Sequence, residues 1–214
     1  MPGPVPQPTP VFHITNIDNL DLIIASGTLQ AIADIKAAGV GYTSIAHQNI
    51  RDRRASTQVP CGPGGFLHNY VPFYFGVRSP MLYTISLGNV EGYEQGQEAI
   101  IYLVSTAQKV SNAKLGYVFT DGHGIMEFTG FFEDLAHLGE VDWPLMKKKY
   151  WYDTVDEPDR KRRRQAEFLV HGGLPWTLVE GIVVMNNARE AHVQALLQGA
   201  AHKPPVSVQR NWYY

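Results

Sequence analysis

The sequence predicts an α+β fold built on a largely antiparallel, curved sheet. Segments typical of strands and of helices follow one another irregularly, without the regular β-α-β order that produces a parallel sheet. Strand-like segments outnumber helices late in the chain, and no internal repeat divides it. The length of 214 residues suits one folded domain, which we expect over residues 11–214.

The first half combines short strands with short helices. Val11 to Thr15 alternates apolar and polar residues, which predicts a strand. Leu20 to Ile24 supplies the apolar stripe of a helix that Gly27 ends. The other expected elements are a helical or loop segment over 30–38, a helix from 44 to 54, a loop over 57–66, an aromatic strand over 71–75 and a strand or turn over 81–86.

The second half is richer in strands and closes with one amphipathic helix. Ala191, Val193 and Leu196 share one side of that helix, as expected for a buried face. The expected elements are strands over 98–104 and 116–120, a tight turn at 121–124, an irregular stretch over 125–159, strands over 166–170 and 177–185, the helix over 188–197 and an edge strand over 206–208.

Composition excludes several classes of protein. A single cysteine, Cys61, excludes an internal disulfide framework and a cysteine-based metal site, and it favours a reducing, cytoplasmic location. No apolar run approaches the length of a membrane span, and we expect neither a membrane partner nor a metal. Residues 1–10 lack the charged start and apolar core of a signal peptide, and are expected to form a proline-rich, extended tail.

Basic residues are concentrated in two clusters, although the net charge is only −2. Residues 147–149 and 160–164 together hold eight of the 18 lysines and arginines. A local basic patch on a near-neutral protein suits a polyanion bound at one place. The simpler interpretation is that such a run forms a solvated surface.

Glu167 follows the second basic cluster and opens a predicted buried strand. A carboxylate beside apolar residues costs free energy to bury unless it is paired or functional. A glutamate at the start of a strand is more often a surface or edge residue. Its position directly after a cationic run instead suggests a carboxylate that acts on a phosphate-rich substrate.

Polar residues of the first half are candidates for ligand binding. His13 and Thr15 share one face of the first strand, where they are able to hydrogen-bond a polar ligand, although such a histidine is more often a satisfied core residue. Arg51, Arg53 and Arg54 lie at the C-terminal end of a predicted helix, where cations stabilise the helix dipole. Alternatively, one of these arginines turns inward to a phosphate or a carboxylate.

The irregular stretch over 125–159 combines aromatic residues with Lys147, Lys148 and Lys149. A long segment with weak periodicity is usually functional or mobile. Its rings and ammonium groups are able to stack on bases and neutralise phosphates, as in single-strand binders. The alternative is a partly helical cap whose aromatic residues fill the core, and both interpretations stay open at this point.

Common nucleotide-binding and hydrolase motifs are absent from the sequence. It contains no P-loop, no glycine-rich dinucleotide signature after a strand, no zinc-protease helix and no nucleophile elbow. The remaining polar strand, arginine-bearing helix, aromatic strand and Glu167 suit chemistry at a sugar carbon. There a carboxylate stabilises an oxocarbenium-like transition state and an arginine neutralises a pyrophosphate.

From about Val11 onward the sequence resembles the DarT family of DNA ADP-ribosyltransferase toxins. The resemblance is carried by F-H-I-T-N-I-D-N-L at 12–20, I-A-S-G-T-L at 24–29, N-I-R-D-R-R at 49–54, V-P-F-Y-F-G-V-R-S-P-M-L-Y at 71–83 and R-R-Q-A-E-F-L-V at 163–170. It implies an ADP-ribosyltransferase fold with a split, curved, mostly antiparallel sheet and flanking helices. It also implies NAD as co-substrate, single-stranded DNA as substrate, and a macrodomain antitoxin of the DarG type as partner.

The resemblance further implies roles for individual residues. Glu167 corresponds to the catalytic glutamate of the family and Arg51 to its essential arginine. Residues from about 35 to 53 correspond to an NAD-binding loop and helix, and residues from about 116 to 167 to the loop that presents the acceptor. The implied NAD contacts are His13, Ile14, Thr15, Leu22, Gln30 and Arg51.

The implied reaction joins ADP-ribose to a thymine base of single-stranded DNA, in a sequence-dependent way, and releases nicotinamide. Glu167 would polarise the nicotinamide ribose, and Arg51 would orient or deprotonate the thymine. Candidate DNA contacts are His123, Trp143, Lys147, Lys148, Lys149, Tyr150, Trp151, Arg162 and Arg163. Two alternatives stay open: the same fold acting on guanine, RNA or protein, and a non-catalytic nucleic-acid-binding module that uses residues 147–164.

Overall fold

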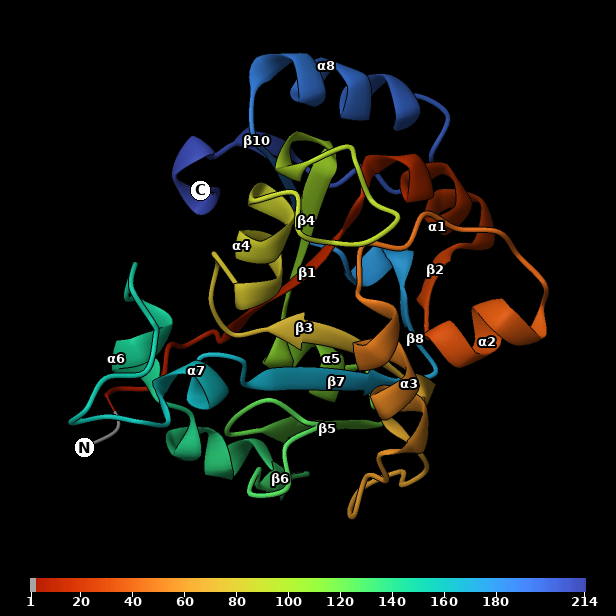
Figure 1. Ribbon diagram of the computed structural model, residues 1–214. Helices are drawn as coiled ribbons and strands as arrows, with labels where there is room; N and C mark the ends of the chain where they lie inside the picture. The colour runs from red at the N-terminus through yellow and green to blue at the C-terminus, as the bar shows by residue number, and fades with distance from the viewer. Residues whose placement is uncertain (1–2) are drawn as a thin grey trace.

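A large mixed sheet forms the centre of the protein (Figure 1). The computed structural model describes residues 3–214, within which this sheet has the strand order β10-β9-β4-β1-β3-β7-β5-β6. Its strands are β1 (Pro10–Asn16), β3 (Tyr70–Tyr74), β4 (Ile100–Thr106), β5 (Tyr117–Thr120), β6 (Phe131–Phe132), β7 (Glu167–His171), β9 (Gly181–Val184) and β10 (Val206–Val208). A separate two-stranded sheet pairs β2 (Thr28–Gln30) with β8 (Gly173–Pro175).

The large sheet is divided between β1 and β3. β1 pairs with β4 along its whole length, but it pairs with β3 only at Phe12 and Tyr74. The half formed by β10, β9, β4 and β1 therefore runs in a different direction from the half formed by β3, β7, β5 and β6 (Figure 1). All pairs are antiparallel except β9 with β10. The predicted α+β fold with a split, mostly antiparallel sheet is confirmed.

Short helices flank the sheet. They are α1 (Leu20–Ser26), α2 (Ile32–Ala37), α3 (Gln48–Ser56), α4 (Pro80–Ser86), α5 (Ala107–Asn112), α6 (Trp143–Met146), α7 (Arg160–Arg163) and α8 (Asn187–Leu196). Short 3₁₀ turns cover Ile17–Asn19, Leu67–Asn69, Gln97–Ala99, Leu135–Glu140, Trp176–Leu178 and Arg210–Trp212. As predicted, α1 ends at Gly27, which adopts a left-handed conformation with φ of 69°. Among residues 3–214, the structure contains no helix with the length and apolar character needed to span a bilayer.

The two faces of the sheet bury different parts of the chain. On one face, Val11 and Phe168 belong to the largest apolar cluster. On the other face, Phe12 packs with α4 and with the aromatic segment 212–214. Because side chains alternate along strands, and because Glu167 pairs with Tyr74 and Tyr74 with Phe12, these three residues share the second face at the division of the sheet.

Some expected elements differ from the observed ones. The segment 81–86 was expected to be a strand or turn, but it forms α4. Ser79 caps this helix by accepting a hydrogen bond from the Leu82 backbone N–H, and Pro80 occupies its first turn. The strand expected over 177–185 is shorter, because a 3₁₀ turn precedes β9. The helix expected from Ser44 begins only at Gln48.

The described part of the proline-rich segment packs against the protein. Residues 1 and 2 lie outside the described residues, and residues 3–9 have no regular secondary structure. Val5 contacts the main apolar cluster, and Thr9 is fully buried with its backbone N–H donating to Gln108 Oε1 at 2.8 Å. The extended segment therefore leads directly into β1 and lies against α5.

Candidate active site

Glu167 is the first residue of β7, and its side chain is only 3% exposed. Arg54 donates from Nη1 to Glu167 Oε2 at 2.7 Å. The backbone N–H of Gly124 donates to Glu167 Oε1 at 3.1 Å. One guanidinium and one backbone donor thus compensate the cost of burying this carboxylate, and they fix both of its oxygens.

The turn that follows β5 supplies the Gly124 N–H, and Arg162 holds this turn in place. Arg162 donates from Nη1 to Asp121 Oδ1 at 3.0 Å and from Nη2 to Asp159 Oδ2 at 2.8 Å. Its carbonyl accepts a hydrogen bond from the His123 backbone N–H at 3.1 Å. A Cβ atom at Gly122 would overlap with Arg162 Nη1, so a larger residue there would displace the guanidinium from the turn.

Helix α3 provides the arginines of the site. Arg51 and Arg54 lie one turn apart and therefore share a side of the helix. The Arg51 guanidinium lies 5.8 Å from the centre of the Tyr42 ring, and its Nη1 donates to Gln48 Oε1 at 3.1 Å. Arg53 instead reaches the Ile125 carbonyl at 2.9 Å. The alternative that one arginine of this helix turns inward to a carboxylate is confirmed, and the residue is Arg54.

Several polar atoms beside this arginine pair are buried without a protein partner. They are the Tyr42 hydroxyl, Arg51 Nε, Arg54 Nη2 and His68 Nε2. Burial lowers the pKa of His68, and the nearby cations Lys36, Arg54 and Arg51 lower it further. Because buried polar groups are normally hydrogen-bonded, this set fits a ligand that is anionic and rich in acceptors, such as the diphosphate of a dinucleotide.

His13 lies where β1 and β3 diverge. Its Nδ1 donates to the Pro72 carbonyl at 2.8 Å, and its ring packs 5.5 Å from the Phe73 ring. Burial lowers the pKa of His13 from 6.5 to about 4, so the imidazole is neutral at pH 7. Since the carbonyl can only accept, the proton resides on Nδ1, and Nε2 is left as an acceptor at the division of the sheet.

Thr15 is connected to the loop that precedes α3. Asn19 donates from Nδ2 to Thr15 Oγ1 at 3.0 Å and to the Thr43 carbonyl at 2.9 Å. The Thr43 backbone N–H donates back to Asn19 Oδ1 at 2.8 Å. Asn19 thereby joins the first strand to the segment that carries Tyr42, beneath the Arg51 guanidinium.

The other expected NAD contacts occupy varied positions. Ile14 is buried in the apolar cluster of the second sheet face, with an exposed fraction of 5%. Leu22 is exposed on α1, and Gln30 is half-buried at the end of β2. Within residues 3–214, no hydrogen bond connects the Gln30 side chain to Arg54 or Glu167.

Of the residues expected to contact DNA, His123 lies next to the residue that hydrogen-bonds Glu167. It precedes Gly124 in the turn that binds Glu167. Burial lowers its pKa, an effect that the Glu167 charge partly opposes. Lys147, Lys148, Lys149 and Tyr150 are exposed, with the Lys149 ammonium 5.5 Å from the centre of the Tyr150 ring.

The structure argues against base stacking by Trp143 and Trp151. Trp143 is 2% exposed, and its Nε1 donates to the Leu138 carbonyl at 2.8 Å. Trp151 is 6% exposed, and its Nε1 donates to the Tyr214 hydroxyl at 2.9 Å. Both indole rings fill the interior, so for these two residues the alternative of an aromatic cap holds.

The cationic run 160–164, which was expected to bind a polyanion, is mostly engaged within the protein, and its binding to DNA stays a prediction. Arg162 is engaged by Asp121 and Asp159, and Arg163 by Asp142 and Glu157. Arg160 pairs with Glu157. Arg164 is 1% exposed and donates to the Val77 carbonyl. Two acidic residues close in sequence, Glu157 and Asp159, and two from separate segments, Asp121 and Asp142, therefore pair with most of this positive charge.

Sequence reasoning missed three parts of the site: Arg54 as the partner of Glu167, the Gly124 N–H, and the Arg162 contacts that hold the turn. A signal for the first was present, because Arg54 lies one helical turn after Arg51. A signal for the second was the Asp-Gly-His-Gly turn directly after a strand.

A buried carboxylate held by an arginine at the division of a split sheet suits an enzyme that transfers a group from a ribose carbon. The chain belongs to the DarT family, because the family model described as "ssDNA thymidine ADP-ribosyltransferase, DarT" matches residues 12–214. A DNA ADP-ribosyl transferase of Thermus sp. (strain 2.9) is 44% identical over 211 residues, with 98% of each chain covered.

Solved structures agree with this assignment. Thermus sp. 2.9 DarT in complex with ADP-ribosylated ssDNA superposes with a TM-score of 0.93 at 42% identity, covering 100% of both chains. Thermus sp. 2.9 DarT in complex with NAD+ superposes with a TM-score of 0.85 at 41% identity, covering 99% of this chain and 100% of that one.

Proposed function

We propose that this protein transfers ADP-ribose from NAD to a thymine base in single-stranded DNA and releases nicotinamide. The observation that carries the proposal is Glu167, buried at the division of the sheet and bonded by Arg54 and the Gly124 N–H. Membership of the DarT family and the likeness to Thermus DarT structures with NAD+ and with ADP-ribosylated ssDNA support the choice of both substrates.

NAD would be held by the polar atoms around α3. Arg51 and Arg54 carry buried nitrogens without protein partners, and the Tyr42 hydroxyl and His68 Nε2 lie in the same region. These donors match the acceptor-rich diphosphate. Two residues of β1 would contribute further polar contacts. The neutral His13 offers Nε2 as an acceptor. Thr15 offers its hydroxyl, which Asn19 connects to the loop that contains Thr43.

Glu167 is placed to stabilise positive charge on a ribose as the bond from ribose to nicotinamide breaks. Arg54 and Gly124 fix the carboxylate in orientation, so little reorganisation is needed at the moment of reaction. The new bond joins the ribose carbon to the thymine, whose ring loses a proton. His123 has a neutral imidazole beside Glu167 to hydrogen-bond the base, and Arg51 would orient it.

The same proposal includes the role of a toxin in a toxin–antitoxin pair. Family membership supports a macrodomain antitoxin of the DarG type as the partner, because a protein that modifies DNA bases needs an inhibitor or a reversing enzyme in its own cell. Expression of this protein in bacteria with and without such an antitoxin, scored by colony formation, tests the proposed role as a toxin.

The direct test is mass spectrometry of single-stranded oligonucleotides incubated with the protein and NAD. Matched oligonucleotides with and without thymine separate the acceptor from the reaction class. We expect the mass of one ADP-ribose to be added only to thymine-containing strands. Addition to thymine-free strands would move the acceptor to another base. No addition to any strand, with DNA still bound, would contradict the proposed activity in favour of a binding module or a protein acceptor.

A further inference from the structure

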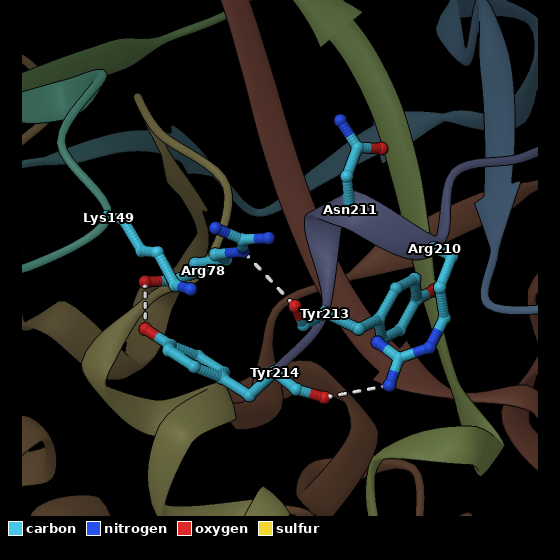
Figure 2. A pocket seen from close by; sticks show the side chains of 6 residues that line it. All are labelled: Arg78, Lys149, Arg210, Asn211, Tyr213 and Tyr214. Atoms are coloured by element: carbon cyan, nitrogen blue, oxygen red, sulfur yellow. Dashed lines mark hydrogen bonds between the residues drawn. The ribbon is translucent and has the colours of Figure 1, made fainter.

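We propose that a basic cleft beside the aromatic segment 212–214 binds backbone phosphates of the single-stranded DNA on one side of the reacting base. The inference rests on the proposed function, and it adds a DNA subsite outside the catalytic centre. The cleft has a volume of about 600 Å³ and is lined by Arg78, Lys149, Arg210, Asn211, Tyr213 and Tyr214 (Figure 2).

The charged side chains that line this cleft are all positive. Three of its six lining residues are cations, and none is acidic. No aspartate or glutamate among residues 3–214 forms an ion pair with Arg78, Lys149 or Arg210. In the run 160–164, by contrast, three arginines pair with acidic residues and Arg164 is buried, so the cleft offers more unpaired positive charge than the run.

Hydrogen bonds between the two arginines of the cleft and the segment 213–214 hold these cations in position. Arg78 donates from Nε to the Tyr213 carbonyl at 3.1 Å, and Arg210 donates from Nη2 to the Tyr214 carbonyl at 3.1 Å (Figure 2). The Tyr214 hydroxyl donates to the Arg78 carbonyl at 2.7 Å. These bonds use only part of each guanidinium, so other nitrogens of Arg78 and Arg210 are left for a phosphate.

Helix α4 lies between the catalytic centre and the cleft and contacts residues of both. Tyr74 pairs with Glu167, and its hydroxyl donates to Met81 Sδ at 3.8 Å in α4. In the same helix, the Tyr83 ring lies 5.0 Å from the Tyr214 ring. A nucleic acid strand that presents a base at Glu167 would therefore pass along α4 to the cleft.

Exposed rings next to the cleft suit an unpaired strand. Tyr83 is 36% exposed, Tyr150 60% and Tyr152 52%. Aromatic faces stack on unpaired bases, whereas a duplex hides them. The positive side chains of the cleft and the exposed tyrosine rings beside it together favour single-stranded DNA over an acidic protein surface as the occupant.

The test combines charge removal in the protein with charge removal in the DNA. Binding of a thymine-containing oligonucleotide is measured by fluorescence anisotropy without NAD, over a series of salt concentrations. The variant is Lys149→Gln with Arg210→Gln. The matched control, Arg189→Gln with Lys203→Gln, loses the same charge from residues that do not line the cleft. Each oligonucleotide is compared with forms that carry an uncharged methylphosphonate at one flanking position.

We expect the salt slope of the cleft variant to be shallower than wild type by about 1.4, because each phosphate contact on a single strand contributes about 0.7. Flanking methylphosphonates should weaken wild-type binding and leave the cleft variant unchanged. The KM for long oligonucleotides should rise severalfold, while kcat stays at the wild-type value.

A wild-type salt slope in the cleft variant, or equal methylphosphonate effects in both proteins, would overturn the proposal. An equal loss in the control variant would do so as well, since it would reflect net charge alone. Failure of wild-type protein to modify any oligonucleotide would instead refute the proposed function. That outcome is distinguishable because the binding measurement does not need turnover.

Discussion

The Arg54–Glu167 ion pair is a nearly buried ion pair of the site. Their exposed fractions are 13% and 3%, so solvent screens them little. A buried pair of this kind contributes less to stability than its Coulomb energy suggests, because both charges lose hydration. Its larger effect is on orientation, since Arg54 fixes one carboxylate oxygen while Gly124 fixes the other.

At this scale we predict that Arg54→Gln destabilises the protein by about 3 kcal/mol, because the Glu167 charge stays buried without its partner. Urea unfolding checks the value. The matched control is the double variant with Glu167→Gln, which removes the uncompensated charge and should recover part of the loss. Strictly additive losses in this cycle would show that the two side chains are not coupled.

Helix α7 and the turn after β5 behave as one unit. Arg162 joins Asp121 to Asp159, and its carbonyl binds the His123 N–H, so the position of the Gly124 donor depends on the helix. The bonds to Asp159 and Asp121 raise the pKa of Arg162, as expected for a cation held between two carboxylates. These contacts give Arg162 a positioning role for the turn that binds Glu167, and its expected contact with DNA stays a prediction.

For this element we predict that Arg162→Gln lowers kcat by about 10-fold to 10²-fold with little change in the KM for NAD, because the Glu167 donor shifts. Arg162→Lys should recover part of the rate. Lys161→Gln is the matched control, since Lys161 is an exposed neighbour without an ion pair among residues 3–214. Steady-state kinetics that show a changed DNA KM and an unchanged kcat would assign Arg162 to DNA binding instead.

Across the whole molecule, the local sequence pattern predicted helices and strands better than it predicted contacts between distant residues. Alternation in 11–15 and the stop at Gly27 gave β1 and the end of α1, because those signals are local. The Arg54–Glu167 pair joins residues 113 positions apart, and no local pattern encodes it. Glu167, Arg51, Arg53 and Arg54 were candidates from the sequence pattern, but the roles of Glu167 and Arg51 in catalysis were implied only by resemblance to a family.

The ion pairs of the cationic run 160–164 could not be predicted from the composition of that segment. A series of five basic residues predicts a free positive surface when only neighbours along the chain are considered. In the fold, Asp121 and Asp142 arrive from separate segments and pair with Arg162 and Arg163. The free charge lies instead in the cleft of Arg78, Lys149 and Arg210, whose members are dispersed in the sequence.

Stability of the whole domain should depend on the neutral state of His13. Its pKa in the folded protein is about 4, below the ordinary 6.5, so the unfolded chain binds more protons between these values. The stability that His13 contributes is therefore present above pH 6.5 and is lost as the pH falls toward 4. We predict that His13→Asn reduces the loss of unfolding free energy between pH 7 and 4.5 by on the order of 1–2 kcal/mol.

Urea unfolding of both proteins at the two pH values measures this difference. Asparagine retains a side-chain N–H that is able to donate to the Pro72 carbonyl, so the comparison isolates the titration from the hydrogen bond. An identical pH dependence in the two proteins would show that His13 does not stay neutral in the fold.

The most direct test of the site is the single-turnover rate of ADP-ribose transfer to a thymine oligonucleotide by wild-type protein and by Glu167→Gln. NAD affinity is measured in parallel by calorimetry, and circular dichroism confirms that the variant is folded. If the carboxylate at the division of the sheet stabilises the transition state, the rate falls by about 10²-fold to 10³-fold while the Kd for NAD changes little. A folded variant that transfers ADP-ribose at close to the wild-type rate would contradict the role assigned to Glu167.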